Sequence, residues 1–345
     1  MKDALVVRDV TSGVRCHISS GRRVPGSMTA TTPTIEAQNL TKTYPGGVEA
    51  LRGIDFAVGA GEVFGLLGPN GAGKSTTVGM FATTVVPTSG TARLAGHDVA
   101  GDPIAARLSS AVVFQDAVVD KPLSGRHNLM VHARLWGLDA AAARARVGTL
   151  VDLFGLAGIV DRPVGGYSGG ERRRLEIARA LVSEPRVLFL DEPTVGLDPR
   201  IRHELLDVIA GLRAREEMTI LMTTHYLDEA ERLCDRVAII HAGEIVALDT
   251  PSVLLARVGR EVVEVRVAGD ADAALATLRA HDVADDGAFT VGNSIHVPLH
   301  RLHAAEATAA IAGLGLAATV VITRQPTLDD VYLQLTGQVL APLAA

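Results

Sequence analysis

The sequence contains almost no cysteine and no long hydrophobic run. Only two of its 345 residues are cysteine, Cys16 and Cys234, which is too few to cross-link a chain of this length and is typical of a reducing cytosol. No uninterrupted apolar stretch approaches the roughly 18 residues that span a bilayer, so we expect a soluble chain. Positive charge is not in excess either, because 33 Lys and Arg stand against 39 Asp and Glu, a formal net charge of −6. This balance argues against a generally basic nucleic-acid-binding protein, and we expect no nucleic-acid partner.

The composition is that of a folded protein with more than one domain. Hydrophobic residues make up 48% and charged residues 21%, which excludes disorder throughout, and 345 residues is too long for one ordinary domain. Residues 1–33 differ from the rest, since they are rich in Ser, Thr and Gly and show no apolar period. Their longest apolar run, residues 4–7, is too short for a signal peptide. We predict that residues 1–33 are a disordered extension, or that Met28 is the working start.

From residue 34 onward the pattern becomes α/β. Short apolar strand candidates alternate with helical stretches, which is typical of a parallel sheet covered on both faces. The candidates are Val63–Leu67, Ala111–Phe114, Val187–Leu190 and Thr219–Met222. Residues 123–156 read as helix, with apolar side chains at helical spacing and no strand candidate. We therefore predict a domain over residues 34–249 that contains a helical lobe at about residues 116–183.

A further section begins near Thr250. Its pattern predicts a strand, a helix, a hairpin, a second helix and a last strand. These elements are Val262–Val267, Ala273–Arg279, Phe289–Val297, His303–Ala312 and Thr319–Thr323. The order strand, helix, strand, strand, helix, strand indicates a small α+β domain of the ferredoxin-like kind over residues 250–345.

The strongest chemical signal is a glycine-rich loop between an apolar strand candidate and a helix. It matches the phosphate-binding loop pattern without a mismatch, and its members are Gly68, Pro69, Asn70, Gly71, Ala72, Gly73, Lys74, Ser75 and Thr76. Glycines let backbone N–H groups converge on phosphate oxygens, and the helix N-terminus adds positive potential. We expect Lys74 to reach the β- and γ-phosphates and Ser75 to ligate Mg²⁺. The loop predicts a nucleoside triphosphatase without indicating which kind.

Two adjacent carboxylates follow a later apolar strand candidate. Asp191 and Glu192 come directly after Val187–Leu190, and successive side chains of a strand point to opposite sides. One carboxylate can hold the magnesium ion and the other can polarise an attacking water. Alone, the segment fits a strand that runs into a turn equally well, but a phosphate loop upstream favours the catalytic interpretation.

A third segment, Ser168-Gly169-Gly170, precedes the Arg-rich helical stretch Arg172–Leu181. A hydroxyl and free N–H groups at the positive end of a helix form an anion site. By itself a glycine turn with an N-cap serine is the simpler interpretation. A second γ-phosphate site is useful only where two copies of the chain meet.

These motifs together resemble the ATP-binding cassette of ABC transporters over residues 34–249. They stand in the family's order: Tyr44, the phosphate loop, Gln115, Ser168-Gly169-Gly170, Asp191-Glu192, Asp198 in the dimer-contact loop, and His225. The resemblance implies a P-loop NTPase fold with a mixed sheet core and a helical lobe. It also implies ATP and Mg²⁺ as cofactors and a head-to-tail homodimer.

The resemblance assigns roles at the nucleotide. It implies that Tyr44 stacks on adenine, although a tyrosine beside a turn is the simpler interpretation of that residue. It implies that Gln115 contacts Mg²⁺ and the lytic water, and that Asp191 holds the metal. Glu192 is then the general base or water-orienting carboxylate, and His225 hydrogen-bonds the γ-phosphate.

The family's signature segment departs from its common form at one position. By resemblance, Ser168, Gly169 and Gly170 close on ATP bound by the partner copy. The segment here reads Tyr-Ser-Gly-Gly-Glu, where the family more often has Leu-Ser-Gly-Gly-Gln. Glu171 brings a carboxylate near a triphosphate, which is unfavourable unless it points away or pairs with Arg172–Arg174.

Several functional classes share this cassette, and three are disfavoured. A translation-associated ATPase normally carries two cassettes in one chain, and this chain has one. The interval between Lys74 and Ser168 is too short for the coiled coil of a DNA-repair ATPase. Residues 250–345 do not resemble the longer, strand-rich regulatory section of sugar importers.

Residues 125–138 and 325–337 resemble the ATPase subunits of daunorubicin/doxorubicin-resistance-type exporters. This implies an ATPase that energises export of a hydrophobic drug or antibiotic through a separate membrane permease, held at the cytoplasmic face of the membrane. The surface after Gln115, Asp116–Arg126, is the expected permease contact. A lipid or glycolipid exporter is the main alternative, and a non-transport ABC ATPase is a further one.

Overall fold

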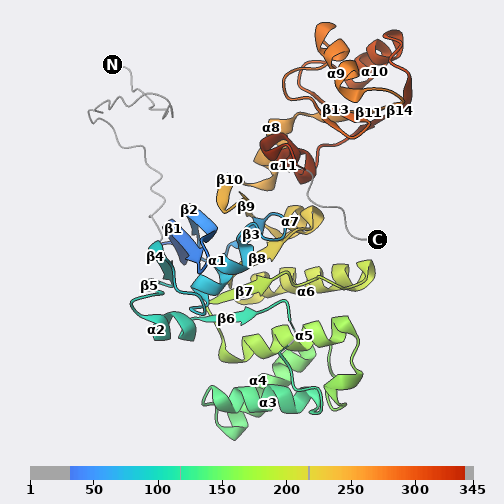
Figure 1. Cartoon of the computed structure of the whole chain (residues 1–345). Coiled ribbons are helices and arrows are strands. Elements are labelled where there is room, and N and C mark those ends of the chain that lie inside the picture. Colours follow the sequence, from blue (N-terminus) through green and yellow to red (C-terminus); the bar gives the residue numbers. More distant parts are fainter. Residues whose placement is uncertain (1–31, 117, 217, 339–345) are drawn as a thin grey trace, which may run out of the picture. The chain divides into compact units, whose positions relative to one another are not determined.

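The computed structural model describes residues 32–116, 118–216 and 218–338 (Figure 1). The predicted N-terminal extension falls almost entirely on residues 1–31, which lie outside the described residues. Within the described ranges, no helix is both long and apolar enough to cross a membrane.

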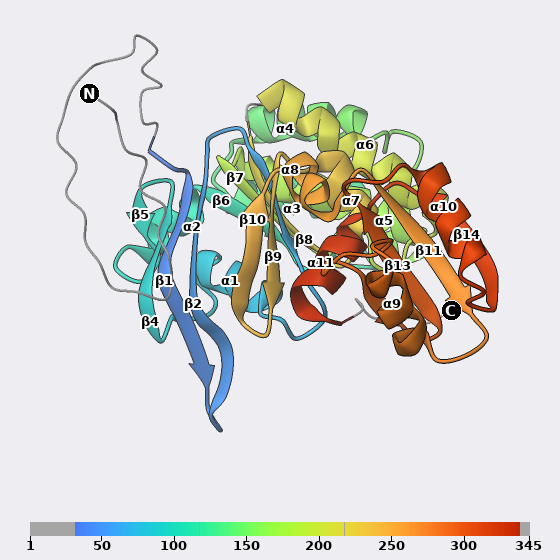
Figure 2. The ribbon, with the colours of Figure 1, turned by 90° about the horizontal axis from the view of Figure 1, so that it is seen from above.

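A six-stranded sheet forms the centre of the cassette. Its order is β10 (Glu244–Asp249), β9 (Arg236–His241), β3 (Val63–Leu67), β8 (Thr219–Thr224), β7 (Val187–Asp191) and β6 (Ser110–Val113). Neighbouring strands are parallel except for β10, which pairs antiparallel with β9 (Figure 2). All four predicted strands are present, with β7 and β8 extended to include Asp191 and Thr224.

The central sheet is buried on both faces because successive side chains of a strand alternate. In β7, Leu188 and Leu190 pack into one hydrophobic core and Phe189 into the other. The second core continues through the stacked rings of Phe81 and Phe189, whose centroids are 6.1 Å apart. The short, fully apolar strand segments in the sequence therefore contribute side chains to two cores at once.

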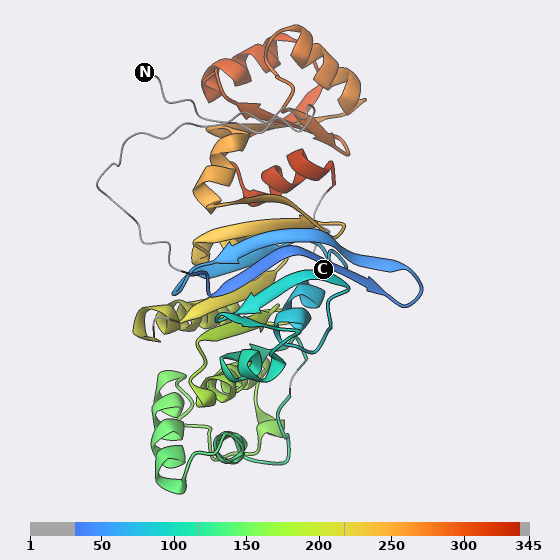
Figure 3. The same ribbon diagram turned by 90° about the vertical axis from the view of Figure 1, so that its left-hand side faces the viewer.

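A second, antiparallel sheet is built from strands that come before and after the nucleotide loop in the chain, and its individual strands were not predicted. Its order is β2 (Val48–Val58), β1 (Ile35–Tyr44), β4 (Ser89–Leu94) and β5 (His97–Asp98). The β1–β2 hairpin is the long blue ribbon pair in Figure 3. Phe56 of β2 stacks on Phe64 of β3 at 5.3 Å between ring centroids, which joins this sheet to the central one.

Helices follow the strands of the central sheet and form the lobe expected at about residues 116–183. The sheet helices are α1 (Lys74–Phe81), α2 (Pro103–Leu108), α6 (Pro199–Glu216) and α7 (Leu227–Leu233). The lobe contains α3 (Gly125–Leu135), α4 (Ala140–Leu153), η1 (Val164–Gly166), α5 (Gly169–Ala180) and η2 (Leu181–Ser183).

Residues 123–156, which read as helix in the sequence, contain two helices, α3 and α4, separated by residues 136–139. Gly137 has φ +83°, in the left-handed region that ends a helix, and the Asp139 carboxylate then caps α4 by accepting from Ala141 N and Ala142 N at 2.8 Å.

The C-terminal section contains the elements in the predicted order. They are β11 (Glu261–Val267), α9 (Ala271–Ala280), β12 (Phe289–Val291), β13 (Ser294–Leu299), α10 (Ala304–Gly313) and β14 (Ala318–Arg324). The strands form an antiparallel sheet in the order β12-β13-β11-β14. Its own hydrophobic core lies between that sheet and the helices α9 and α10.

Two further helices, α8 (Pro251–Val258) and α11 (Leu328–Thr336), pack together and share the cassette's hydrophobic core. Tyr332 of α11 is buried, and its hydroxyl lies 2.7 Å from Nδ1 of His241 in β9. The backbone N–H of Leu328 donates to Glu231 Oε1 of the α7 segment at 3.0 Å. Helix α11 is thus anchored on the helix that follows His225.

Candidate active site

The loop between β3 and α1 takes its path because glycine stands at two crowded positions. A Cβ at Gly68 would lie 2.2 Å from the carbonyl oxygen of Ile240. Gly73 has φ +112° and closes the loop as the N-cap of α1, and a Cβ there would lie 2.6 Å from Leu51 Cδ2. The buried strand, the tight loop and the free N-terminus of α1 together form an anion-binding cradle.

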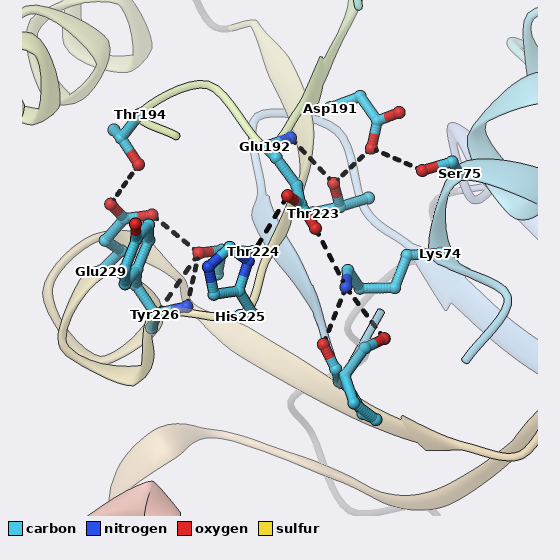
Figure 4. Close-up of polar contacts among 12 residues, drawn as sticks. Lys74, Ser75, Asp191, Glu192, Thr194, Thr223, Thr224, His225, Tyr226 and Glu229 are labelled. Carbon is cyan, nitrogen blue, oxygen red and sulfur yellow. Dashed lines mark hydrogen bonds and ion pairs between the residues drawn. The ribbon is translucent and has the colours of Figure 1, made fainter. Parts of the chain in front are cut away.

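Lys74 is held at the base of this cradle. Its side chain is buried, and Nζ donates to the carbonyl oxygens of Gly68 at 2.7 Å and Pro69 at 3.2 Å (Figure 4). Nζ also lies 3.1 Å from Glu192 Oε1, in an ion pair with both side chains buried. The phosphate-loop lysine and the proposed catalytic carboxylate therefore meet across the fold.

Asp191 and Ser75 stand side by side at the mouth of the loop. Ser75 Oγ donates to Asp191 Oδ1 at 3.3 Å, and Thr223 Oγ1 donates to the same oxygen at 2.6 Å. In the described part of the chain, no hydrogen bond reaches the second oxygen of Asp191. A hydroxyl beside a carboxylate with a free oxygen is a donor set of hard oxygens, which suits Mg²⁺ shared with a phosphate.

Glu192 is held in an unusual backbone conformation. Its φ of +45° lies in the left-handed region, which is rare for a residue with a side chain and concentrates at functional sites. Its N–H donates to Thr223 Oγ1 at 2.9 Å and to the Thr223 carbonyl at 3.2 Å. The turn directs the carboxylate between Lys74 and His225, whose Nδ1 lies 3.4 Å from Glu192 Oε2. Nδ1 of His225 is buried, and apart from this contact with Glu192 it makes no hydrogen bond to any described residue.

A cavity of about 260 Å³ opens beside Lys74, Ser75 and Glu192, and neither Asp191 nor His225 lines it. It is lined by Ala50, Asn70, Gly71, Gly73, Lys74, Ser75, Thr76, Gln115 and Glu192. Gln115 comes from the exposed loop after β6, as its expected role requires. Gly68, Pro69 and Ala72 shape the loop without lining the cavity. Tyr44 lies at the outer side, with its hydroxyl 3.4 Å from Thr76 Oγ1 and its ring 5.0 Å from Lys42 Nζ.

The signature segment lies outside this cavity. Ser168 is exposed as the N-cap of α5, and Gly170 packs so closely on α6 that a Cβ would meet Ile201 Cγ2 at 2.1 Å. Asp198 caps α6, since its Oδ1 accepts from Ile201 N at 3.1 Å. These residues do not join the nucleotide loop of their own chain.

Glu171 is neither free nor paired with Arg172–Arg174. Its Oε2 accepts from Ser168 N at 2.7 Å while Ser168 Oγ accepts from Glu171 N at 3.2 Å, which is a capping box. Arg172 instead donates to the Tyr167 carbonyl at 3.3 Å. The pairing suggested from the sequence is therefore wrong, because the carboxylate satisfies the first turn of its own helix.

Glu229, on α7, is a site residue that the sequence reasoning missed. It is 0% exposed and accepts from Thr194 Oγ1 and, at 2.8 Å, from Thr224 Oγ1. Burial raises the pKa of this carboxyl, and the two hydroxyl donors offset part of that rise. Glu229 thus ties the loop after Glu192 to the residue before His225. The available signal was its place in the first turn of a helix just after the histidine.

Comparison with known proteins gives consistent results. The family described as "ABC transporter" matches residues 51–195. The chain is 47% identical over 239 residues to the daunorubicin/doxorubicin resistance ATP-binding protein DrrA of Streptomyces peucetius, covering 69% of this chain and 72% of that protein. It is 38% identical over 320 residues to the Nod factor export ATP-binding protein I of Ralstonia nicotianae, covering 91% and 97%.

Among solved structures, the chain resembles cbiO1 from Clostridium perfringens, described as part of the ABC transporter complex cbiONQ. The TM-score is 0.61 at 30% identity, covering 65% of this chain and 91% of that one.

Proposed function

The chain belongs to the ATP-binding proteins of ABC transporters, and on that premise we propose that it hydrolyses ATP to energise export of a hydrophobic drug or antibiotic through a separate membrane permease. The observation that carries the proposal is the meeting of Lys74, Glu192 and His225 beside Ser75 and Asp191. In this proposal Lys74 is the phosphate-binding cation, Glu192 the carboxylate for water, and Ser75 with Asp191 the oxygen-rich metal corner.

Each side chain of the site has a separate role in ATP binding or hydrolysis. Lys74 and the N–H groups of the loop bind the β- and γ-phosphates, and Tyr44 stacks on the base. In the described state Glu192 pairs with Lys74, so an arriving γ-phosphate competes for the lysine and releases the carboxylate. Glu192 then orients the attacking water and accepts its proton, while His225 hydrogen-bonds the γ-phosphate.

Magnesium is the second cofactor in this proposal. Ser75, Asp191 and Gln115 would hold it, and when bound it neutralises phosphate charge and polarises the phosphoryl group. The fit rests on the free carboxylate oxygen of Asp191 next to the Ser75 hydroxyl.

The working unit is a homodimer of the cassette. Ser168, Gly169, Gly170 and Asp198 lie away from the cavity of their own chain. In a head-to-tail pair the Ser168 hydroxyl and the free N–H groups of α5 would complete the site of the partner copy.

The proposed permease contact lies on the surface formed by the residues after Gln115. Val118, Leu123, Val131 and Leu135 are exposed although apolar, with Leu135 79% exposed, whereas Val119 packs against the core. Val131 and Leu135 are four residues apart on α3 and so lie on one face of it, and an exposed apolar face suits a membrane subunit as partner. This contact would hold the chain at the cytoplasmic face of the membrane.

We assign residues 34–249 to the cassette and residues 250–345 to an accessory ferredoxin-like domain. The separate hydrophobic core between the β11–β14 sheet and helices α9 and α10 supports this division, while α8 and α11 join the accessory domain to the cassette's core. The Ralstonia relative extends over 91% of the chain but is named for Nod factor export, so the accessory residues do not by themselves indicate a drug as cargo.

The test uses inverted membrane vesicles that contain this chain together with its permease. Doxorubicin uptake is followed by fluorescence quenching after ATP addition, in parallel with uptake of a labelled lipo-oligosaccharide. We expect ATP-dependent doxorubicin uptake that is lost in Glu192→Gln. Uptake of the glycolipid alone would favour the alternative cargo, and ATP hydrolysis without uptake of either compound would contradict export.

A further inference from the structure

Arg173 is buried between α5 and the ends of β6 and β7, and all of its donors are used. The side chain is 6% exposed, and its guanidinium contacts four backbone carbonyls and one carboxylate. Nε donates to Pro193 O at 2.8 Å, Nη1 to Phe114 O at 2.6 Å and Glu176 Oε2 at 3.0 Å, and Nη2 to Asp191 O at 3.1 Å and Glu192 O at 3.4 Å. Five acceptors match the five N–H groups of an arginine.

The four carbonyls belong to the two segments that carry catalytic side chains. Phe114 directly precedes Gln115, and the other three carbonyls form the end of β7 and the turn at Glu192. The left-handed φ of Glu192 persists only if neighbouring groups hold it there. Arg173 supplies donors to the residue itself and to the residue on each side of it.

The helix that carries Arg173 begins at Ser168. Gly169–Ala180 is one continuous helix, so Ser168 and Arg173 move as a rigid body about one turn apart. The end of α5 that would face the partner's nucleotide is therefore linked mechanically to the backbone of Glu192.

We propose that Arg173 is a positioning residue for hydrolysis, which holds the backbones of Gln115 and Glu192 in register and couples them to the Ser168 end of α5. The proposal rests on the proposed ATPase function and adds a residue that touches neither nucleotide nor water. The arrangement of the five acceptors around Arg173 requires a planar guanidinium and not merely a positive charge. A lysine carries three N–H donors on one nitrogen and cannot serve five acceptors spread around a planar group.

The experiment compares Arg173→Lys with the matched control Arg174→Lys. Arg174 is the next residue on the same helix and, among the described residues, donates no hydrogen bond to residue 114 or to residues 191–193. Steady-state kcat and KM for ATP are measured in the purified full chain, together with binding of a fluorescent ATP analogue. We expect kcat to fall at least about tenfold in Arg173→Lys, with KM and analogue affinity within about threefold of the parent, and Arg174→Lys to behave like the parent.

A kcat within about threefold of the parent would overturn the proposal, and so would a raised KM at unchanged kcat, because that result assigns Arg173 to nucleotide binding. If the parent chain itself does not hydrolyse ATP, the proposed function fails and the inference fails with it. Measuring ATP hydrolysis by the parent chain therefore distinguishes a failure of the proposed function from a failure of the inference about Arg173 alone.

Amide hydrogen exchange gives a second readout that a general packing role would not produce. We expect faster exchange in residues 113–116 and 191–196 of Arg173→Lys, with residues 68–76 at the parent rate. Uniformly faster exchange would contradict positioning. If Arg173→Lys does not fold, Arg173→Gln combined with Glu176→Gln removes both buried charges and carries the same measurements.

Discussion

Replacing Glu229 with Gln should stabilise the protein at neutral pH, whereas replacing it with Ala should destabilise it. Glu229 is completely buried, and among the described residues its side chain accepts hydrogen bonds from the hydroxyls of Thr194 and Thr224. Burial disfavours the ionised carboxyl and raises its pKa. A glutamine of the same shape avoids that desolvation and still presents an oxygen to one hydroxyl and an NH₂ group to the other.

Glu229→Ala, in contrast, should lower the free energy of unfolding. Two buried hydroxyls lose their acceptor, at about 1–3 kcal/mol for each group left unsatisfied. The deleted side chain also leaves space next to the helix α7. We expect the free energy of unfolding to fall by about 2–5 kcal/mol in Glu229→Ala.

The sign of the pH dependence follows from the raised pKa. The folded state binds the proton of Glu229 more tightly than the unfolded state, so this group stabilises the fold fully below the unfolded pKa of about 4.5. That contribution is lost as the pH rises through the folded pKa. Gln does not titrate. The difference in free energy of unfolding between Glu229→Gln and the parent should therefore increase as the pH is raised above about 4.5, and it should level off above the folded pKa. The total increase is about 1.4 kcal/mol for each unit by which the folded pKa exceeds the unfolded pKa.

Urea denaturation of parent, Glu229→Gln and Glu229→Ala at a series of pH values between about 4.5 and 8 measures these differences. Parallel stability curves for the parent and Glu229→Gln would refute the reasoning, because they would show that the carboxyl has the same pKa in the folded and unfolded chains. A Glu229→Ala variant within about 0.5 kcal/mol of the parent would show that the two hydroxyls find other partners.

Substitutions at three further positions test the nucleotide site and its partner surface. Lys74→Ala should abolish tight Mg-ATP binding, measured with a fluorescent analogue, and an affinity within about threefold of the parent (about 0.7 kcal/mol) would contradict the assignment. Glu192→Gln should keep ATP binding but stop hydrolysis, and the trapped dimer should appear by light scattering, whereas unchanged turnover would exclude Glu192 as the catalytic carboxylate. Glu171→Gln should change neither thermal stability nor ATP-driven dimerisation, because Gln still accepts from Ser168 N, while Glu171→Ala should cost about 1 kcal/mol of stability. Dimerisation that tightens in Glu171→Gln and depends on salt, by sedimentation in Mg-ATP, would show instead that the carboxylate faces the partner's nucleotide.

The sequence alone determined what depends on short, continuous segments. The strand, loop and helix around Lys74 are adjacent in the chain, so their composition predicts both the local structure and the chemistry. The same holds for Asp191 and Glu192 at the end of β7, and for the order of elements after residue 250. These features follow from local backbone preferences and from the alternation of apolar side chains.

Only the tertiary structure decided how these segments meet. No local pattern shows that the Lys74 ammonium pairs with Glu192, or that Glu229 joins Thr194 to Thr224, because each contact is made between different strands and helices. Arg172, Arg173 and Arg174 read alike in the sequence, yet only Arg173 turns toward the strand ends. Its direction is set by which face of α5 packs on the sheet, and that choice is made by the buried core as a whole.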